Sequence, residues 1–318
     1  MSNTHFEILR PGINTTIQDS GRNHMYHEGI AVSGAIDQRN YKFANSLVGN
    51  KVDEAVIEFA YQGPLLKLKN GKINIALTGD IFFKIIRKNS KIENGECYKN
   101  YILEEEDQLD IISTKNTAYG YLSVNGGFQI EKFWNSYSIN TKANIGPNNG
   151  KKYSIGDKIF IKYLNLQKIK QIQLKYTKSS DNIIRVIKGT NFNYFSTESQ
   201  KKFFNKEFSV TKLADRMGIR LSGHKIENIV STNIKSEGLV RGVIQVPADG
   251  DPIIMLSDHG TIGGYPKIGV VISADLDRVG QLTPGSIINF REVSLEEAQN
   301  IFKAYTEDTD KYLNENNY

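Results

Sequence analysis

Residues 242–290 read GVIQVPADGDPIIMLSDHGTIGGYPKIGVVISADLDRVGQLTPGSIINF, and they carry the most informative pattern in the chain. Two apolar runs, Val243–Val246 and Ile253–Leu256, flank the turn-forming sequence Ala-Asp-Gly-Asp-Pro, a pattern that predicts a β-hairpin. Asp258 and His259 then lie where the second strand gives way to a glycine-rich loop, Gly260–Lys267. Loops carried by rigid strands often bear function, and glycine lets a backbone approach a ligand closely. The alternative is an ordinary turn in which Asp258 and His259 only cap backbone amides.

A second informative stretch begins at Asp37. Apolar residues recur at three- and four-residue spacing over Gln38–Val48, and Gly49 follows, so we expect a helix with Asp37 as its N-cap. Ser33 and Gly34 precede it at the positive end of the helix, where a substrate carboxylate or phosphate could bind. The alternative for Asp37 is that it caps the helix and does nothing else.

The remaining pattern is dominated by strands. Short β-branched and aromatic runs fill residues 55–160, and strands resume at 183–187. A turn that delivers a strand recurs at 106–111, 155–160 and 283–288, which suggests two related barrel lobes. Capping boxes predict further helix starts at Thr197 and Ser294. A Lys-, Gln- and Asn-rich stretch at 161–178 indicates a linker.

We therefore predict a mainly β protein with two barrel lobes and a few short helices. The expected division is an N-terminal lobe at 1–165 including the helix at 38–48, a C-terminal lobe at 180–293, and a C-terminal helix and tail at 294–318.

Composition limits the classes of function. The 318 residues carry 40 basic and 35 acidic side chains spread along the chain, without a basic arm, so we expect neither nucleic-acid nor membrane binding by charge. The N-terminus lacks the apolar core of a signal peptide, and no apolar run approaches membrane-spanning length. The single cysteine, Cys97, permits no internal disulfide and fits a reducing compartment. These features predict a cytoplasmic protein.

Several charged residues have competing interpretations. His24 and His27 could ligate a metal, but no usual zinc spacing surrounds them, and we expect no metal site. Arg216 and Arg220 could clamp an anion, although internal salt bridges are the favoured alternative. Glu58, within an apolar strand, either faces water or is a buried carboxylate. No Gly-Lys pair is followed by Ser or Thr as a phosphate-binding loop of the Walker A type requires.

Three blocks of residues occur together in one order between about residues 8 and 293. The first block contains Pro11-Gly12, Gln18-Asp19, Gly21-Arg22, Ser33-Gly34-Ala35, Asp37, Ala44-Asn45, Gly49-Asn50, Glu58 and Gly63-Pro64. The second block contains Asp215-Arg216-Met217-Gly218, Arg220-Leu221 and Gly223. The third block contains Gly242–Pro247, Asp249-Gly250, Asp258-His259, Gly263–Lys267, Ala274-Asp275-Leu276, Gln281-Leu282 and Pro284-Gly285. In these blocks the sequence resembles the carboxyltransferase-type family of the KipA proteins, allophanate hydrolase subunit 2 and the C subunit of 5-oxoprolinase.

The resemblance implies a fold and several functions. It implies that the two lobes are cyclophilin-like β-barrels. It implies a subunit of an ATP-dependent 5-oxoprolinase complex, a hydrolase that converts 5-oxo-L-proline to L-glutamate, with a KipI-like B subunit and a separate A subunit as partners. ATP, with Mg, would be used by the complex. The alternatives are the carboxyltransferase subunit of a biotin-dependent amide carboxylase, with biotin on another polypeptide, and a KipA-type regulatory module that antagonises a kinase inhibitor.

The residues and the resemblance together predict the site. We expect catalytic roles for Asp258, His259 and Asp37, with His259 relaying a proton and Asp258 holding the imidazole in one tautomer. The predicted substrate-binding residues are Gln18, Arg22, His27, Ser33, Gly34, Gln245, Thr261, Gly263, Gly264, Tyr265 and Lys267.

Overall fold

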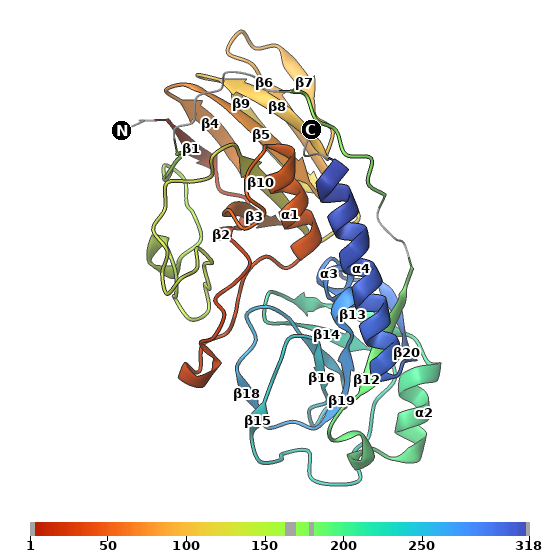
Figure 1. Ribbon diagram of the computed structural model, residues 1–318. Helices are drawn as coiled ribbons and strands as arrows, with labels where there is room; N and C mark the ends of the chain where they lie inside the picture. The colour runs from red at the N-terminus through yellow and green to blue at the C-terminus, as the bar shows by residue number, and fades with distance from the viewer. Residues whose placement is uncertain (1–3, 163–169, 178–180, 316–318) are drawn as a thin grey trace. The chain divides into compact units, whose positions relative to one another are not determined.

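The computed structural model describes residues 4–162, 170–177 and 181–315, and Figure 1 labels most of their helices and strands. The chain divides into two compact units. The first comprises residues 1–22, 33–177 and 309–318, and the second comprises residues 23–32 and 178–308. The segment 23–32 thus packs with the second unit, whereas the expected division assigned it to the N-terminal lobe. The expected boundaries at 165 and 180 lie outside the described residues.

Two sheets make up most of the first unit. One has the strand order β11-β1-β4-β9-β6-β7 and the other has the order β2-β3-β10-β5-β8. The first contains β1 (His5–Arg10), β4 (Leu65–Lys69), β6 (Ile81–Ile86), β7 (Ile92–Asn94), β9 (Gln108–Thr114) and β11 (Lys158–Phe160). The second contains β2 (Ile13–Gln18), β3 (Val56–Ala60), β5 (Lys72–Thr78), β8 (Lys99–Glu104) and β10 (Tyr119–Val124).

The two sheets share one apolar core. Phe6 and Leu66 come from the first sheet, Ile57 and Leu122 come from the second, and all four are buried in the same cluster. Burial alternates along β4, as expected for a strand with one face on a core and one face toward solvent.

Helix α1 (Gln38–Leu47) lies on the second sheet, against β5 and β10, as Figure 1 shows. Its position confirms the predicted helix, and Gly49 follows with a positive φ of 73°. Phe43 and Leu47 form its buried face and pack with Leu174 and Tyr312. A residue from the far end of the chain therefore completes the core of the first unit.

A closed barrel forms the second unit. Its strand order is β12-β19-β16-β17-β14-β13-β20, and the parallel pairing of β20 with β12 closes it. The strands are β12 (Ile183–Lys188), β13 (Phe208–Ala214), β14 (Gly218–Ser222), β16 (Val243–Gln245), β17 (Ile253–Met255), β19 (Lys267–Val271) and β20 (Ile287–Glu292). A small separate sheet pairs β15 (Glu237–Gly238) with β18 (Ile262–Gly263).

The hairpin predicted from the opening stretch is confirmed. Strands β16 and β17 pair antiparallel, with Ile244 opposite Ile254. Aromatic side chains fill the core near helix α2 (Thr197–Asn205), where the Phe203 ring stacks on Phe290 with centroids 4.4 Å apart. The cap of α2 differs from the prediction, because the side chain of Ser196, rather than that of Thr197, accepts a hydrogen bond from the Ser199 amide.

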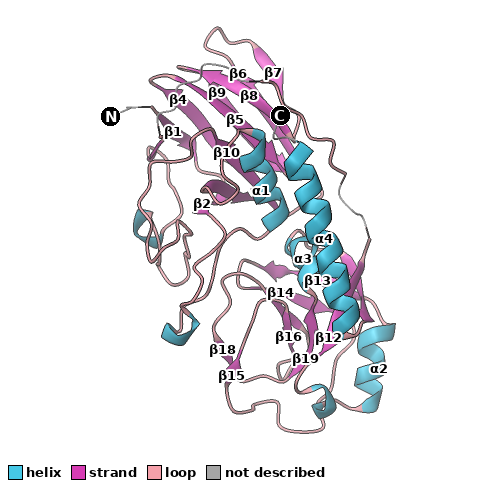
Figure 2. Ribbon diagram, in the orientation of Figure 1, coloured by secondary structure: helices cyan, strands magenta, loops and turns pink. Residues whose placement is uncertain are grey.

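Helices are the minor component, as Figure 2 shows. Besides α1 and α2, the structure has α3 (Leu276–Gly280), α4 (Leu295–Glu315) and the 3₁₀ turns η1 (Tyr26–Glu28), η2 (Asn148–Gly150), η3 (Phe192–Tyr194) and η4 (Ser273–Asp275). The Ser294 hydroxyl accepts from the Glu297 amide at 3.0 Å, so the predicted start of α4 is confirmed. The predicted mainly β fold class is confirmed as well.

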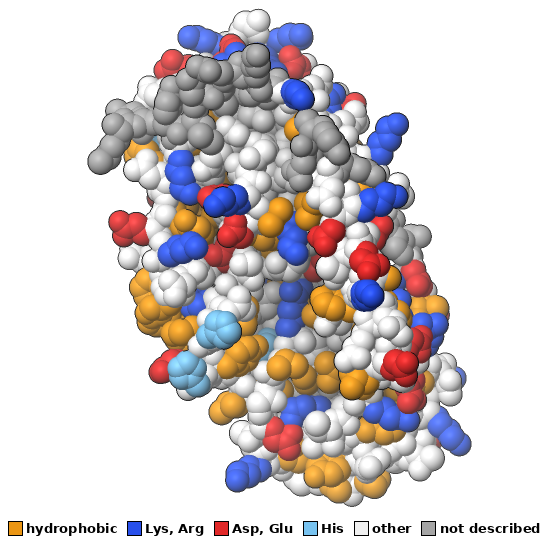
Figure 3. All heavy atoms as spheres, viewed as in Figure 1, with side chains coloured by type: hydrophobic (Ala, Val, Ile, Leu, Met, Phe, Trp, Pro, Cys, Tyr) orange, Lys and Arg blue, Asp and Glu red, His pale blue; other side chains and the backbone are white. Residues whose placement is uncertain are grey.

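The distribution of surface charge and the character of the helices complete the description of the fold. Figure 3 shows Lys and Arg side chains interspersed with Asp and Glu side chains over the face that it draws. None of the helices in the described ranges is long and apolar enough to cross a membrane.

Candidate functional site

The turn after β17 directs two neighbouring polar side chains into the protein. The turn begins at Ser257, and the Asp258 amide donates to the Arg216 carbonyl at 2.8 Å. Asp258 is 5% exposed and His259 is 1% exposed. The turn therefore buries both side chains.

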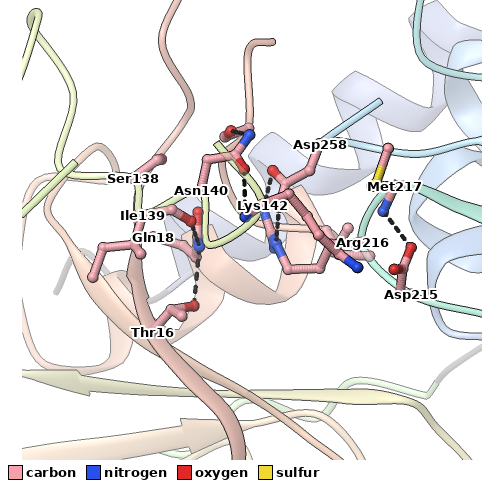
Figure 4. Close-up of polar contacts among 12 residues, drawn as sticks. Thr16, Gln18, Ser138, Ile139, Asn140, Lys142, Asp215, Arg216, Met217 and Asp258 are labelled. Atoms are coloured by element: carbon pink, nitrogen blue, oxygen red, sulfur yellow. Dashed lines mark hydrogen bonds and ion pairs between the residues drawn. The ribbon is translucent and has the colours of Figure 1, made fainter. Parts of the chain in front are cut away.

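Arg216 holds the Asp258 carboxylate in a two-point contact (Figure 4). The guanidinium Nε donates to Oδ2 at 2.8 Å and Nη2 donates to Oδ1 at 3.1 Å. Both side chains are at least nineteen-twentieths buried. A carboxylate held at both oxygens in this fork is fixed in orientation, which suits positioning better than proton transfer.

Internal pairing is thus confirmed for Arg216, and Arg220 pairs with Asp249 at 2.5 Å. Asp215 has a different role, because its carboxylate accepts from the Met217 amide at 2.8 Å (Figure 4).

The His259 ring is bonded at both nitrogens. Nδ1 lies 2.5 Å from the Gly260 carbonyl oxygen and Nε2 lies 3.1 Å from the Tyr26 hydroxyl. A carbonyl only accepts hydrogen bonds, so Nδ1 carries the ring proton and Nε2 accepts from Tyr26. The Gly260 carbonyl therefore fixes the tautomer, a role that we expected Asp258 to play.

Burial is the main influence on the acidity of this imidazole. It lowers the pKa of His259 below the usual value of 6.5, and nearby Arg241 adds to this effect. The Gly260 carbonyl and the Asp258 carboxylate act in the opposite direction. The lowered pKa means that His259 is neutral at pH 7 and can accept a proton at Nε2.

The glycine-rich loop packs tightly on the strand before it. The Gln245 carboxamide donates to the Tyr265 carbonyl at 3.1 Å. A Cβ atom at Gly263 would lie 2.7 Å from the side-chain nitrogen of Gln245 and 2.7 Å from a methyl group of Leu239. A Cβ atom at Gly264 would lie 3.2 Å from the Ile234 carbonyl oxygen. The glycines therefore serve close packing within the loop.

Three further predicted residues lie in this loop. Thr261 is buried, whereas Tyr265 is 39% exposed. Lys267 is buried at the start of β19, and its ammonium group pairs with the Glu237 carboxylate and holds the pKa of Glu237 below its usual range. Tyr265 is thus the most accessible of the three.

His27 belongs to the same unit but lies on its surface. It is part of η1, its side chain is 71% exposed, and its Nε2 lies 3.3 Å from the Glu28 carboxylate. Within the ranges that the structure describes, no group of three or more His, Cys, Asp or Glu side chains could hold a metal ion.

The other predicted residues lie in the first unit and have structural contacts. The Gln18 carboxamide donates to Thr16 Oγ1 at 3.0 Å and to the Ile139 carbonyl at 2.8 Å (Figure 4). Arg22, which is 1% exposed, donates to the carbonyls of Phe133 and Ser138.

Residues 33–37 form the approach to α1. The Ser33 hydroxyl accepts from the Asn140 amide group at 3.1 Å. Gly34 has a φ of 82°, and a Cβ there would lie 2.8 Å from the Gly21 nitrogen. Asp37 is the N-cap as predicted, since its Oδ1 accepts from the Asn40 amide at 2.9 Å.

Three backbone amides that precede α1 are already paired within the protein. The amide of Ala35 donates to the Asp19 carbonyl at 2.9 Å, and that of Ile36 donates to the Glu58 carboxylate at 2.8 Å. The Asp37 amide donates to the Tyr121 hydroxyl at 2.8 Å. Glu58 is completely buried, so one of the protein's own carboxylates lies on the approach to α1. The anion site at this helix end stays a prediction.

The structure therefore brings together Asp258, His259, Gln245 and the glycine-rich loop within the second unit. Gln18, Arg22, Ser33, Gly34 and Asp37 belong to the first unit. Tyr26 was missed by the sequence analysis. Its contact with His259 joins residues 233 positions apart, and no local pattern signals it.

Comparison with known proteins identifies the family. A family model described as the carboxyltransferase domain, subdomain A and B, matches residues 28–292. The chain belongs to this family. The resemblance carried by the three sequence blocks is thereby confirmed.

Relatives of the carboxyltransferase-domain family include proteins of similar length. The protein named as the C subunit of 5-oxoprolinase in Escherichia coli (strain K12) is 29% identical over 301 residues, which cover 92% of both chains. The protein of the same name from Haemophilus influenzae is 32% identical over 292 residues, with the same coverage.

A much larger protein contains the same fold. The crystal structure of the K. lactis urea amidolyase matches with a TM-score of 0.87 and 26% identity. The match covers 97% of this chain and 20% of that chain, so the present chain spans about a fifth of that protein.

Proposed function

We propose that the chain is a subunit of an ATP-dependent 5-oxoprolinase complex, which hydrolyses 5-oxo-L-proline to L-glutamate. The observation that carries the proposal is the coverage of the relatives. Two proteins named as the C subunit of 5-oxoprolinase match over 92% of their own length and 92% of this chain. In the urea amidolyase the matching region is a fifth of a longer polypeptide.

We further propose that the active complex contains a KipI-like B subunit and a separate A subunit, and that these bind ATP with Mg. The sequence has no Walker A loop, so we assign no phosphate-binding residue to this chain. The single cysteine supports a cytoplasmic location for the complex.

The contribution of this chain would be a positioned imidazole beside a glycine-rich loop. Lactam hydrolysis requires a proton to leave the attacking water and a proton to reach the ring nitrogen as the C–N bond breaks. His259 has the neutral form and the fixed tautomer that such proton transfer needs.

Reconstitution tests this proposal. The chain is co-expressed with candidate A and B subunits of a 5-oxoprolinase, and glutamate release from 5-oxoproline is measured with and without ATP. We expect ATP-dependent release from the complete set and none from the chain alone or from the set lacking it. Equal release without this chain would refute the proposal.

Carboxyl transfer from biotin is the second candidate, and the TM-score of 0.87 to the urea amidolyase favours it. The sequence has no Met-Lys-Met biotinylation motif, so biotin would be carried by another polypeptide. Carboxylation of urea by the chain with a biotin carboxylase, a biotin carrier, ATP and bicarbonate, without glutamate release from 5-oxoproline, would select this candidate. If both activities are absent and the chain reverses inhibition by its KipI-like partner, it is a KipA-type regulator.

A further inference from the structure

Tyr26 reaches the buried His259 from a segment that is distant in sequence. It lies in η1, within residues 23–32, and these pack with the second unit although residues on both sides belong to the first. The Tyr26 hydroxyl is 3.1 Å from Nε2 of His259, and the two ring centroids are 6.1 Å apart. The contact therefore depends on a segment of ten residues that leaves the first unit in sequence and packs with the second.

The two side chains differ in access. His259 is 1% exposed, and its ring nitrogens face Gly260 and Tyr26. Tyr26 is only partly buried. A substrate would therefore meet the phenol before it met the imidazole.

The hydrogen bonds also set a direction for proton movement. Because Nδ1 donates to the Gly260 carbonyl, Nε2 has a lone pair aimed at the Tyr26 hydroxyl. The phenol can pass its own proton to Nε2 at the moment when its oxygen accepts a proton from another molecule.

We infer that Tyr26 is the catalytic residue that exchanges protons with the substrate and that His259 acts through it as a positioning residue and proton store. This inference rests on the proposed function, since it assigns the proton path for opening the amide ring.

The proton balance closes in two steps. ATP use by the other subunits would activate the lactam beforehand. As water then attacks the lactam carbon, one water O–H bond breaks and an O–H bond forms at Tyr26, while the original Tyr26 proton moves to Nε2 of His259. When the C–N bond breaks, Tyr26 gives its proton to the ring nitrogen and recovers one from the imidazolium. Both side chains end in their starting states, and no further acid or base is needed.

The charges around the pair define its pH dependence. Asp258, held by Arg216, favours the imidazolium, whereas burial and Arg241 disfavour it. Burial also raises the pKa of Tyr26 above its usual value, so the phenol remains protonated at neutral pH. The acid limb of the rate profile should therefore reflect His259, with a midpoint below 6.5.

The central variants separate proton transfer from packing. Tyr26→Phe removes only the hydroxyl. His259→Asn keeps an amide nitrogen that can donate to the Gly260 carbonyl but has no group at the position of Nε2. Tyr194→Phe and His224→Gln are the matched controls, because both residues lie on the surface of the same unit and outside the site.

In the reconstituted complex we expect Tyr26→Phe and His259→Asn each to lower kcat by at least about tenfold, the low end of typical acid–base contributions. The double variant should be no slower than the slower single variant, because the two residues form one path. The acid limb should be lost in both, and the controls should match the wild type. Normal kcat for Tyr26→Phe would overturn the inference.

A measurement on the chain alone distinguishes failure of the inference from failure of the proposed function. In ¹⁵N NMR of the histidine rings, we expect His259 as the Nδ1–H tautomer, with an Nε2 shift that changes in Tyr26→Phe but not in Tyr194→Phe. If the wild-type complex releases no glutamate, the proposed function fails and the NMR result decides on the pair. An Nε2–H tautomer, or an Nε2 shift indifferent to Tyr26, would contradict the proton path.

Discussion

Replacing Arg216 with Met should destabilise the second unit far more than loss of a surface ion pair does. The substitution keeps most of the side-chain volume but leaves the Asp258 carboxylate, with 1% of its side chain exposed, without the guanidinium that holds both of its oxygens. Breaking a buried pair in this way costs about 3 to 5 kcal/mol. Two unit charges about 4 Å apart interact with about 4 kcal/mol at the effective dielectric constant of protein interiors, so the two magnitudes agree.

The matched control is Arg220→Met. Arg220 pairs with Asp249, but these side chains are 30% and 49% exposed. An exposed pair contributes about 0 to 1 kcal/mol.

Calorimetry distinguishes the two variants. Arg216→Met should lower the Tm of the second unit by on the order of 10 °C, at a few degrees per kcal/mol, and Arg220→Met should lower it by only a few degrees. Adding Asp258→Leu to Arg216→Met should recover much of the loss, because the unpaired charge is removed. Equal effects of the two arginine substitutions would refute this account of the pair.

Three further predictions follow from local geometry and acidity. Asp37→Ala removes the cap of α1 and should lower the free energy of unfolding, measured in urea, by about 1 kcal/mol. If turnover of the complex falls no further than this loss of stability explains, Asp37 acts only as a cap. Gly34→Ala and Gly49→Ala both impose a positive φ on alanine, but only the new Cβ at position 34 would lie 2.8 Å from a backbone atom. Gly34→Ala should therefore lower the free energy of unfolding more, and an equal loss of stability in the two variants would exclude the clash. Burial lowers the pKa of His259, so the stability it contributes is present above pH 6.5 and is lost as the pH falls through the lowered value. The stability difference between the wild type and His259→Asn should shrink correspondingly between about pH 7.5 and 5, and a constant difference would contradict the assignment.

Local sequence signals predicted the elements well. The spacing of apolar residues and the Asp37 cap located α1, and two apolar runs around Ala-Asp-Gly-Asp-Pro located the β16–β17 hairpin. These signals succeed because a helix period, a cap and a tight turn each involve residues within a few positions of one another. The cap of α2 was misplaced by one residue, since Ser196 and Thr197 are both suitable caps and the sequence does not rank them.

Partners distant in sequence could not be predicted. Arg216 and Asp258 are 42 positions apart, and internal pairing was expected without its partner being known. The donors near Ser33 suggested an anion site, and no local pattern revealed that Glu58, 22 positions after Ile36, accepts a hydrogen bond from the Ile36 amide. Hydrophobic periodicity states which side of an element is buried, not which polar group meets it there.

The way in which the two units share the chain has a consequence for biosynthesis. Residues 309–315 are translated after the whole of the barrel, yet Tyr312 packs against Phe43 in the first unit. Residues 23–32 are translated long before the barrel, yet Tyr26 contacts His259 within the second unit. The first unit therefore cannot reach its final packing until the ribosome has completed the barrel, and the barrel needs a segment that was translated before most of the first unit. A gene cut at the junction near residue 178 would encode two pieces that each lack part of their own structure, so the halves should be inherited and exchanged together.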